Sequence, residues 1–355
     1  MKFERKLSDK EYLFDIYEPN PPSFLKEFLE TEEMRRLMDV GMHCGCEYTS
    51  FPLFSFVHPY SRWLHSAGVG LIVWHYTQDI AQSVAGLLHD IATPVFAHVV
   101  DFLNGDPIRQ ETTEEGTLER IQEAEDIQCL LKKYGLKTED VADYHLYPIA
   151  DNPAPALSAD RLEYTLGNFY CRGIKSRKEI ARMYDNLLCL PNEQGIVELT
   201  FASRELAEEF TLASLENSRM YTADEDRFCM QYLADLLKCG LEWGILSPQD
   251  LDSTETEVIG RLTTDERSAK LWEDYCGFCR IGAGDRKPEG RYSVRVPSKL
   301  RYIDPLCLPD DTSRKPVRIS RLSRAVEKQI EQFNNTSFDR WIWTEEADDG
   351  LGRFA

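Results

Sequence analysis

Seven histidines occur in the chain, and four of them lie in its most apolar stretch, between residues 61 and 103. An imidazole is costly to bury there unless it has a polar partner. His89 and Asp90 are adjacent in AGLLHDIATPVFAH, His65 precedes them in RWLHSAGVG, and Asp160 follows in LSADRLEYTLGN. Two imidazoles and two carboxylates form a mixed nitrogen and oxygen ligand set. Such a set predicts one divalent transition metal, namely Mn, Fe, Ni, Co or Zn.

Adjacent side chains on a helix diverge by about 100°, so the His89-Asp90 dyad can bind an ion only from one edge. The remaining ligands must come from other helices, and we predict His65 and Asp160 for that role. Gly68 follows His65 and would let a neighbouring helix approach closely, although glycine weakens a helix. A metal held in this way would lower the pKa of its water and supply hydroxide near neutral pH.

Asp160, Tyr164 and Asn168 are spaced by four residues and therefore share one stripe of a helix. Leucines flank this stripe, which makes it resemble the wall of a pocket more than a solvent-facing surface. The alternative for Asp160 is a purely local role, because a carboxylate near a helix start is favoured by the helix dipole.

The elements that must position these residues are mainly helices. Residues 61–103 are apolar on nearly every face, which is typical of buried helices. Amphipathic patterns predict further helices, and alternation predicts short strands. The predicted helices are 23–41, 113–133, 177–190, two within 203–245 that separate near Tyr221, and 318–333; the predicted strands are 196–200 and the segments RYSVRVP, LRYIDPL and KPVRIS.

The turn-rich segment GAGDRKPEG marks a change in composition near residue 285. We therefore expect a mainly α protein with a small α+β C-terminal lobe. The expected division is an N-terminal helix and loop region packed on the core, a helical domain, a small basic lobe and an acidic tail, at 1–60, 61–284, 285–345 and 346–355.

Charge is distributed unevenly along the 355 residues, whose net charge is −20. Between Arg286 and Arg324 eleven Lys and Arg stand against four Asp and Glu, a net charge of +7, which leaves −27 for the rest. The basic lobe either only docks on the acidic body or also supplies cations to a phosphate-bearing ligand. The overall acidity makes nucleic acid an unlikely partner.

The chain is 42% hydrophobic, which excludes a disordered protein, and it contains no apolar run of the length that a membrane span needs. Its first residues lack the apolar core of a secretory signal. Ten scattered cysteines then indicate reduced thiols, and we expect a cytoplasmic protein without membrane contact. The pairs Cys44 with Cys46 and Cys276 with Cys279 are expected to be free thiols, because no other pair completes a zinc-finger spacing.

The order H…HD…D, with its flanking residues, resembles the HD-domain metal-dependent phosphohydrolase superfamily. RWLHSAGVG is similar to the R-x-x-H-S-x-G-V segment of that family, LLHDIATPVFAHVVD to its HD-x-x-x-x-x-F-x-H-x-x-D segment, and ADRLEYTL to its D-R/K-x-x-Y segment. Within the superfamily the pattern is closest to the deoxynucleoside triphosphate triphosphohydrolases. The resemblance implies an HD-type helical core, and homo-oligomers are common among such relatives.

The resemblance also implies roles for individual residues. Arg62 would contact phosphate, and Tyr164 would line the substrate site. His98 and Asp101 would orient water or assist proton transfer. Asn168 stands near the position of an aspartate that often reads the sugar hydroxyl, and its amide can still bind a hydroxyl.

Two positions depart from that branch. Thr93 stands where a histidine is usual, and so does Thr113 in Thr113-Glu114-Glu115-Gly116. Threonine cannot replace imidazole as an acid or base near pH 7. Either Glu114 or Glu115 takes over that catalytic role, or the reaction differs.

We therefore expect a phosphohydrolase that acts on a nucleotide or a related phosphate ester through metal-activated water, with Mg bound alongside the substrate as a further option. Hydrolysis of deoxynucleoside triphosphates is the first expectation, followed by phosphomonoesterase or cyclic-nucleotide phosphodiesterase activity. The alternative is a metal-stabilised nucleotide-binding or regulatory protein with little turnover, which the two threonines motivate.

Overall fold

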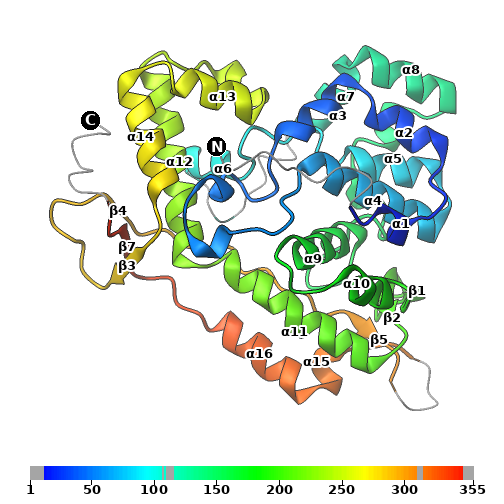
Figure 1. The fold of residues 1–355 in the computed structure, drawn as a ribbon. Helices are drawn as coiled ribbons and strands as arrows, with labels where there is room; N and C mark the ends of the chain where they lie inside the picture. The colour runs from blue at the N-terminus through cyan, green and yellow to red at the C-terminus, as the bar shows by residue number, and fades with distance from the viewer. Residues whose placement is uncertain (1–11, 106–107, 109–115, 310–314, 347–355) are drawn as a thin grey trace.

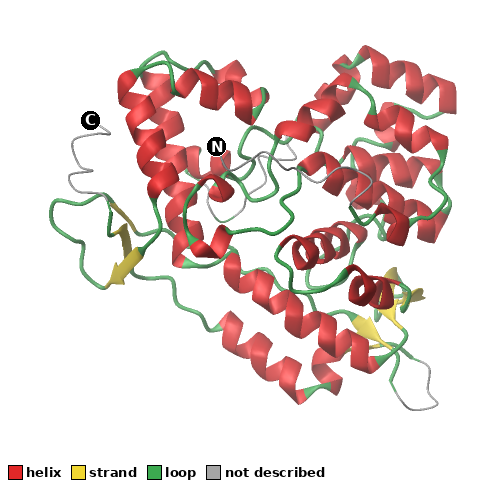
Figure 2. Ribbon diagram, viewed as in Figure 1, coloured by secondary structure: helices red, strands yellow, loops and turns green. Residues whose placement is uncertain are grey.

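The computed structural model describes residues 12–105, 108, 116–309 and 315–346. Helices dominate it, and two small sheets lie at opposite sides of the lower half in the view of Figure 2. The prediction of a mainly α protein is confirmed. Within the described residues, every helix is too short or too polar to cross a lipid bilayer.

Most helices in the first part of the chain lie around the α4–α5 hairpin, against which α2 packs, whereas α6 packs against α12 (Figure 1). Their bounds are α1 Phe14–Tyr17, α2 Ser23–Leu29, α3 Glu32–Arg36, α4 Arg62–Thr77, α5 Ile80–Leu88, α6 Val99–Leu103, α7 Thr117–Glu123 and α8 Glu125–Tyr134. Short 3-10 helices lie between them at η1 Leu37–Asp39, η2 Cys46–Tyr48, η3 Pro52–Phe54, η4 Thr138–Asp140 and η5 Tyr144–Leu146.

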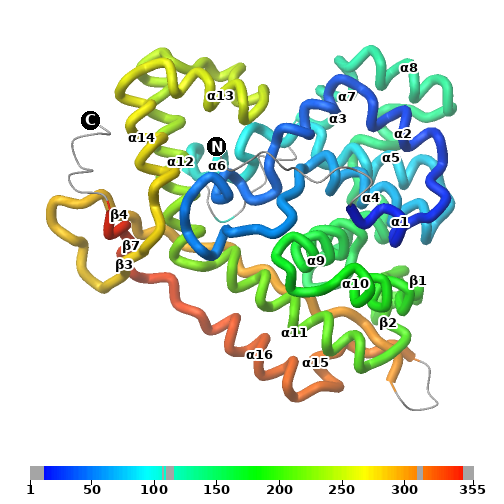
Figure 3. The backbone as a smooth tube through the Cα atoms, viewed as in Figure 1, coloured from blue at the N-terminus to red at the C-terminus, as the bar shows by residue number. Residues whose placement is uncertain are grey.

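The second part begins with α9, which packs against α4 and α11. Its helices are α9 Ala159–Cys171, α10 Arg177–Tyr184, α11 Arg204–Met220, α12 Asp224–Glu242, η6 Pro248–Asp252, α13 Glu255–Leu262, α14 Glu266–Gly277, α15 Ile319–Leu322 and α16 Arg324–Asn334. Figure 3 shows α11 leading diagonally into α12, with α16 alongside α11.

Two sheets are formed by short strands. The first has the order β1-β2-β5-β6, in which β2 and β5 are parallel and the other pairs antiparallel. The second has the antiparallel order β3-β7-β4. The strands are β1 Leu187–Pro191, β2 Val197–Phe201, β3 Ile281–Gly284, β4 Ser293–Val294, β5 Leu306–Cys307, β6 Val317–Arg318 and β7 Trp341–Thr344.

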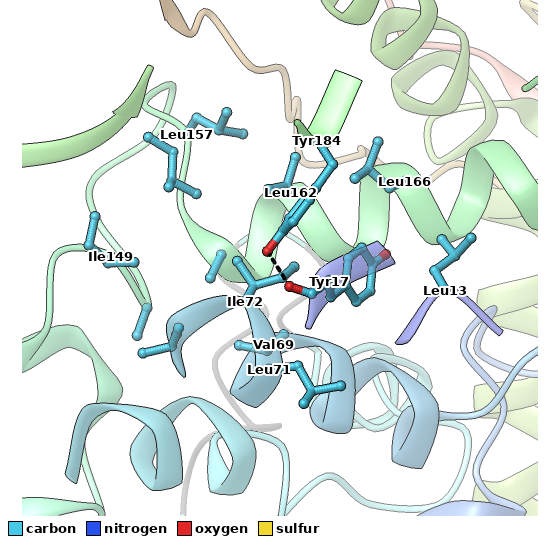
Figure 4. Close-up of a cluster of buried hydrophobic side chains, with 14 of the residues drawn as sticks. Leu13, Tyr17, Val69, Leu71, Ile72, Ile149, Leu157, Leu162, Leu166 and Tyr184 are labelled. Carbon is cyan, nitrogen blue, oxygen red and sulfur yellow. Dashed lines mark hydrogen bonds between the residues drawn. The ribbon is translucent and has the colours of Figure 1, made fainter. Parts of the chain in front are cut away.

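Buried side chains form two hydrophobic clusters. The larger cluster joins α4, α5, α9, α11 and the first sheet, and the smaller one joins α6, α12, α14 and the second sheet. In the larger cluster the Tyr184 hydroxyl donates to the carbonyl of Tyr17 at 2.9 Å (Figure 4). This contact fixes the N-terminal segment onto the helical core.

Several predicted elements differ from the observed ones. The predicted helix 23–41 is wrong as a continuous element. Thr31 has an extended backbone and its hydroxyl donates to the carbonyl of Phe28, so α2 ends there and α3 begins anew. The predicted helix 177–190 ends at Tyr184, because the apolar LLCLP pairs with β2 as β1. The two helices predicted within 203–245 are confirmed, with their separation at Tyr221.

The segment predicted as one basic lobe, 285–345, lies in two places. Its strands β4 and β7 pair with β3, whereas β5 and β6 extend the sheet of β1 and β2. The strands predicted in RYSVRVP and KPVRIS shrink to two residues each, β4 and β6. The strand predicted in LRYIDPL is wrong except at its last residue, Leu306, where β5 begins. The domain boundaries stay a prediction.

Candidate functional site

Helix α4 places Arg62 and His65 in its first turn. The Ser61 hydroxyl caps the helix by accepting from the amide of Leu64. Both Arg62 and His65 are buried, with 6% and 1% of their surfaces exposed. These two polar side chains therefore project into the protein interior, where each requires a partner.

The glycine in α4 allows close helix packing, as the sequence predicts. A Cβ atom added at Gly68 would lie 2.6 Å from Cγ of Glu163 on α9, and one at Gly70 would lie 3.0 Å from Cβ of Leu87 on α5. The first distance is shorter than real Cβ contacts tolerate, and the second is tighter than most of them. The approach of α9 to α4 therefore depends on Gly68, and Gly70 eases the approach of α5.

His89 and Asp90 follow the last turn of α5, which ends at Leu88. His89 donates from Nδ1 to the carbonyl of Gly86 at 2.8 Å, and this bond directs Nε2 away from its own helix. The chain then turns until α6, with His98 just before that helix. His89 and His98 consequently lie on separate elements, with Pro94 in the turn between them.

Helix α9 carries the third group of predicted residues. The Ser158 hydroxyl caps it by accepting from the amide of Arg161, and Asp160 lies in the first turn. Asp160, Tyr164 and Asn168 all line one cavity of about 840 Å³. This volume lies within the usual range for sites that bind small molecules.

His65, His89 and Asp160 converge at one end of this cavity. Nε2 of His65 lies 3.2 Å from Nε2 of His89 and 3.1 Å from Oδ1 of Asp160, and Nε2 of His89 lies 3.7 Å from the same oxygen. Ligand atoms about 2.1 Å from one ion lie roughly 3.0–3.4 Å apart in octahedral or tetrahedral geometry. The three side chains therefore fit a single divalent metal ion, and we call them the metal triad.

The opposite nitrogens of both rings are already engaged. Nδ1 of His65 donates to Oε2 of Glu163 at 2.6 Å, and the carbonyl of Gly86 can only accept from Nδ1 of His89. With these protons on Nδ1, both neutral rings direct an Nε2 lone pair into the 3.2 Å space between them. Two lone pairs repel at this distance unless a metal ion or a proton lies between them. The donor set therefore fits a metal.

Glu163 is a site residue that sequence reasoning missed. It is fully buried, and its Oε1 accepts from the hydroxyls of Tyr12 at 2.6 Å and Tyr17 at 3.3 Å. Its position three residues after Asp160 places both carboxylates on one face of α9, which was the available signal. Glu163 thereby orients the His65 ring, as carboxylates commonly do for histidine ligands of metals.

Asp90 lies beside the metal triad. Its Oδ2 is 3.6 Å from Nε2 of His89 and 3.8 Å from Nε2 of His65, and it also accepts from Arg62 at 2.7 Å. Oδ1 accepts from the Thr93 hydroxyl at 2.8 Å. Metal ligation by Asp90 and phosphate contact by Arg62 stay predictions. Thr93, which departs from the related pattern, holds the carboxylate of Asp90.

Burial and charge set the protonation of this end of the cavity. Burial alone would raise the pKa of Asp90, but the nearby Arg62 outweighs it and holds that pKa well below its usual value. Burial would also raise the pKa of Asp160, yet its hydrogen bond to His65 lowers it. Burial would lower the pKa of His65, whereas its bonds to Asp160 and Glu163 raise that pKa to about 10. A metal would compete with that proton for Nε2.

His98 and Asp101 form a hydrogen-bonded pair, with Nδ1 of His98 2.9 Å from Oδ2 of the fully buried Asp101. Burial lowers the pKa of His98 to about 4, so its imidazole is neutral near pH 7. His98 lines the cavity. Its predicted part in water orientation or proton transfer stays a prediction.

Asn168 is held by several partners. Its Oδ1 lies 2.7 Å from Nε2 of His43, and its Nδ2 donates to the carbonyl of Tyr164 and to the hydroxyl of Tyr221, both at 2.8 Å. His43 and Tyr221 also line the cavity, and sequence reasoning assigned neither of them. Hydroxyl recognition by Asn168 stays a prediction, because its amide already ties two cavity walls together.

The segment 298–302 forms another side of the cavity and brings Lys299 and Arg301 to it. Its ends are anchored, since the Ser298 hydroxyl donates to the carbonyl of Tyr221 at 3.3 Å and the amide of Asp304 to the carbonyl of Pro155 at 2.8 Å. The sequence grouped these residues in a basic lobe that either docks or supplies cations. Two of its cations do line the cavity.

Other predicted residues lie elsewhere. Glu114 and Glu115, together with Thr113, lie outside the described residues. His75 lies on the outer side of α4 and pairs with Glu18. All ten cysteines are free thiols, and the metal triad is the one metal-ligating cluster among the residues that the structure describes.

Comparisons with known proteins agree with this geometry. No model of a protein family matches the chain. The chain is 30% identical to the uncharacterized protein YdhJ of Bacillus subtilis over 275 residues, which covers 76% of this chain and 80% of that protein. It is 25% identical over 206 residues to the metal-dependent phosphohydrolase cns2 of Cordyceps militaris, which covers 57% of this chain and 54% of that protein.

Two solved structures share the fold. A hypothetical protein from Aquifex aeolicus superposes with a TM-score of 0.62 at 17% identity, over 92% of this chain and 93% of that one. A phosphohydrolase from Bacteroides thetaiotaomicron superposes with a TM-score of 0.59 at 13% identity, over 98% of this chain and 97% of that one. At these identities the two structures show a shared fold.

Proposed function

The chain belongs to the same family as YdhJ of Bacillus subtilis, and on that premise we propose that it is an HD-type metal-dependent phosphohydrolase acting on a nucleotide or a related phosphate ester. The observation that carries the proposal is the facing pair of Nε2 atoms of His65 and His89, 3.2 Å apart, with Asp160 closing the set. This triad opens into a cavity of small-molecule size.

A divalent ion held by the triad would lower the pKa of a bound water and supply hydroxide for attack on phosphorus. The chain provides the surrounding groups. Arg62 and Arg301 line the same cavity and would oppose the negative charge that grows on the phosphoryl oxygens. His98 is neutral and its Nδ1 donates to Asp101, so its Nε2 can accept a hydrogen bond from a water without carrying charge.

Among substrates, a deoxynucleoside triphosphate is the first candidate, followed by nucleoside monophosphates and cyclic nucleotides. Two arginines at the cavity are already committed to carboxylates: Arg62 pairs with Asp90, and Arg161 with Asp151 at 3.0 Å. A triphosphate carries more charge than a monophosphate and needs more cationic contacts. The number of phosphates is therefore the property that the first assay must resolve.

The test is phosphate release by the Mn²⁺-loaded protein from four substrates: a deoxynucleoside triphosphate, the matching monophosphate, a cyclic nucleotide and p-nitrophenyl phosphate. His89→Gln removes one triad ligand. His75→Gln is the matched control, because His75 lies on the same α4 helix as His65 but is exposed and pairs with Glu18 at the surface. We expect turnover of at least one substrate by the wild type and by His75→Gln, and none by His89→Gln.

The second candidate is a metal-stabilised nucleotide-binding or regulatory protein. Thr93 favours it, because this residue holds Asp90 by a hydrogen bond and offers no acid or base. Nucleotide binding of equal strength in the wild type and His75→Gln, without phosphate release from any substrate, would favour this candidate over the hydrolase.

A further inference from the structure

The junction between α11 and α12 forms part of the cavity into which the metal triad also opens. Met220 and Tyr221 end α11, and Asp226 and Met230 belong to the first turns of α12; all four line the cavity. The Tyr221 hydroxyl accepts from Asn168, which lies eight residues after Asp160 on α9. Eight helical residues span roughly 12 Å, so the Asn168–Tyr221 contact lies about that far along α9 from Asp160.

Asp226 is the weakly bonded carboxyl group of the cavity. Among the residues that the structure describes, the hydrogen-bond partner of Asp226 is Sγ of Cys46, at 3.9 Å from Oδ1. A thiol is a weak donor, and a carboxyl group in a cavity wall otherwise needs strong partners. Burial raises the pKa of Asp226 to about 8, and the charges of Arg227 and Arg301 only partly oppose this rise.

Apolar and aromatic groups line the same cavity as this carboxyl group. The thioethers of Met220 and Met230 line the cavity beside it, and the ring of Tyr221 stands edge-on to that of Tyr164, with 6.5 Å between their centroids. Thioether and aromatic side chains pack well against flat rings. The junction therefore offers apolar faces for a ring and one polar group for its edge.

We propose that the α11–α12 junction binds the nucleobase of the substrate, with Asp226 hydrogen-bonded to the polar edge of that base. This proposal rests on the proposed function for the position of the phosphate, but it concerns a different set of residues. A nucleobase presents donors and acceptors on neighbouring atoms of a flat ring. A neutral carboxyl group matches such an edge, because it offers one donor and one acceptor side by side.

A purely local role for Asp226 is less consistent with its surroundings. A carboxylate in the first turn of a helix is favoured by the helix dipole. However, α12 also has Asp224 and Glu225 in that turn, and Asp224 pairs with Arg227 and Arg340. Two other acidic residues therefore already interact favourably with the dipole at this helix start. Asp226 is the acidic residue of this turn that lines the cavity.

The experiment measures binding of nucleosides, which lack phosphate, to the metal-free protein by calorimetry. Adenosine, guanosine, cytidine and uridine are the probes, and ribose is the comparison without a base. Asp226→Ala removes the polar group, Asp226→Asn keeps a donor and an acceptor, and Glu225→Ala is the matched control in the same helical turn. Thermal unfolding of each variant confirms that it is folded.

We expect at least one nucleoside to bind more tightly than ribose. Asp226→Ala should weaken this binding by about tenfold or more, since a lost hydrogen bond costs about 1–1.5 kcal/mol or more. Asp226→Asn and Glu225→Ala should stay close to the wild type. Equal weakening in Asp226→Ala and Glu225→Ala would overturn the proposal, because it would assign the effect to the helix start.

The result also separates this proposal from the hydrolase proposal. Phosphate release from p-nitrophenyl phosphate without binding of any nucleoside would overturn the nucleobase site and leave the hydrolase intact. Nucleoside binding that depends on Asp226, without phosphate release from any substrate, would support the nucleobase site and contradict the hydrolase.

Discussion

The carboxyl groups at the metal triad and at the α11–α12 junction have different hydrogen-bond partners. At the metal end, Asp90 accepts from Arg62 and Thr93, and Glu163 accepts from His65, Tyr12 and Tyr17. At the α11–α12 junction, Asp226 accepts from one thiol. The difference indicates that the protein completes the metal end with its own side chains and leaves hydrogen-bonding capacity at the junction. We infer that this capacity serves a ligand.

The largest expected effect is at the buried ion pair of the metal end. Arg62→Ala leaves the Asp90 carboxylate without its cation, and both side chains are only 7% exposed. Breaking such a pair costs about 3–5 kcal/mol, because a buried charge is left uncompensated. Urea unfolding of the metal-free protein measures this loss of stability.

The matched control for Arg62→Ala is Arg182→Ala, which breaks a surface pair with Glu205 whose partners are 57% and 78% exposed. Its cost should stay below about 1 kcal/mol. Similar losses in the two variants would show that the metal end does not depend on its internal partners.

Removing the support of His65 should lower metal affinity. Glu163→Gln keeps the size of the side chain but replaces a carboxylate that accepts from Nδ1 of His65 at 2.6 Å. Loss of such a partner typically weakens metal binding by about 10- to 100-fold. Competition with a fluorescent Mn²⁺ or Zn²⁺ chelator measures the dissociation constant, with Glu209→Gln on the surface of α11 as the control. An unchanged dissociation constant would contradict the orienting role of Glu163.

At the junction, replacement of the carboxyl group should increase stability. Burial raises the pKa of Asp226 in the folded protein to about 8, whereas an unfolded aspartate has a pKa of about 3.9. Between these two values the folded state binds more protons, so the contribution of Asp226 is present below about pH 4 and is lost as pH rises towards 8. Arg301, Arg227, Glu225 and Cys46 are the charged and titratable neighbours that share this environment.

Asp226→Asn should therefore match the wild type near pH 4 and be more stable by at least about 1.4 kcal/mol near pH 8, the equivalent of one pKa unit, because it removes a carboxyl group whose ionised form the folded protein disfavours. Thermal or urea unfolding at the two pH values checks this difference. If Asp226→Asn were less stable than the wild type at pH 8, the Asp226 carboxylate would be well stabilised by the protein, which would contradict the difference described between the junction and the metal triad.

The smallest expected effect concerns the two tyrosine hydroxyls that donate to Glu163. The hydroxyl of Tyr17 lies 3.3 Å from Oε1 of Glu163, whereas that of Tyr12 lies at 2.6 Å. Tyr17→Phe should cost about 0.5 kcal/mol of stability, at the low end for a hydrogen bond, and Tyr12→Phe more. Urea unfolding of both variants gives the order, and a larger cost for Tyr17→Phe would contradict this reading of the distances.

The sequence predicts the metal end better than the junction, for a physical reason. His65, His89 and Asp160 are unusual residues in apolar segments, and buried polar groups there require partners. The helix period then places Tyr164 and Asn168 on the side of Asp160. Local patterns are enough for these residues, because each pattern lies within one helix.

The α11–α12 junction is formed by contacts between distant segments, which no local sequence pattern predicts. In the sequence, Asp226 resembles an ordinary acid in the first turn of a surface helix. In the structure it contacts Cys46 and lines the cavity together with the 298–302 segment. Glu163 was likewise hidden, because its partner Tyr12 is distant in the chain. The strands were overestimated in length, because alternation of side chains does not state where pairing stops.

The place of the 298–302 segment in the chain has a consequence for biosynthesis. A ribosome releases His65, His89 and Asp160 well before Lys299 and Arg301, so the cavity receives this cationic side only after the metal triad has been synthesised.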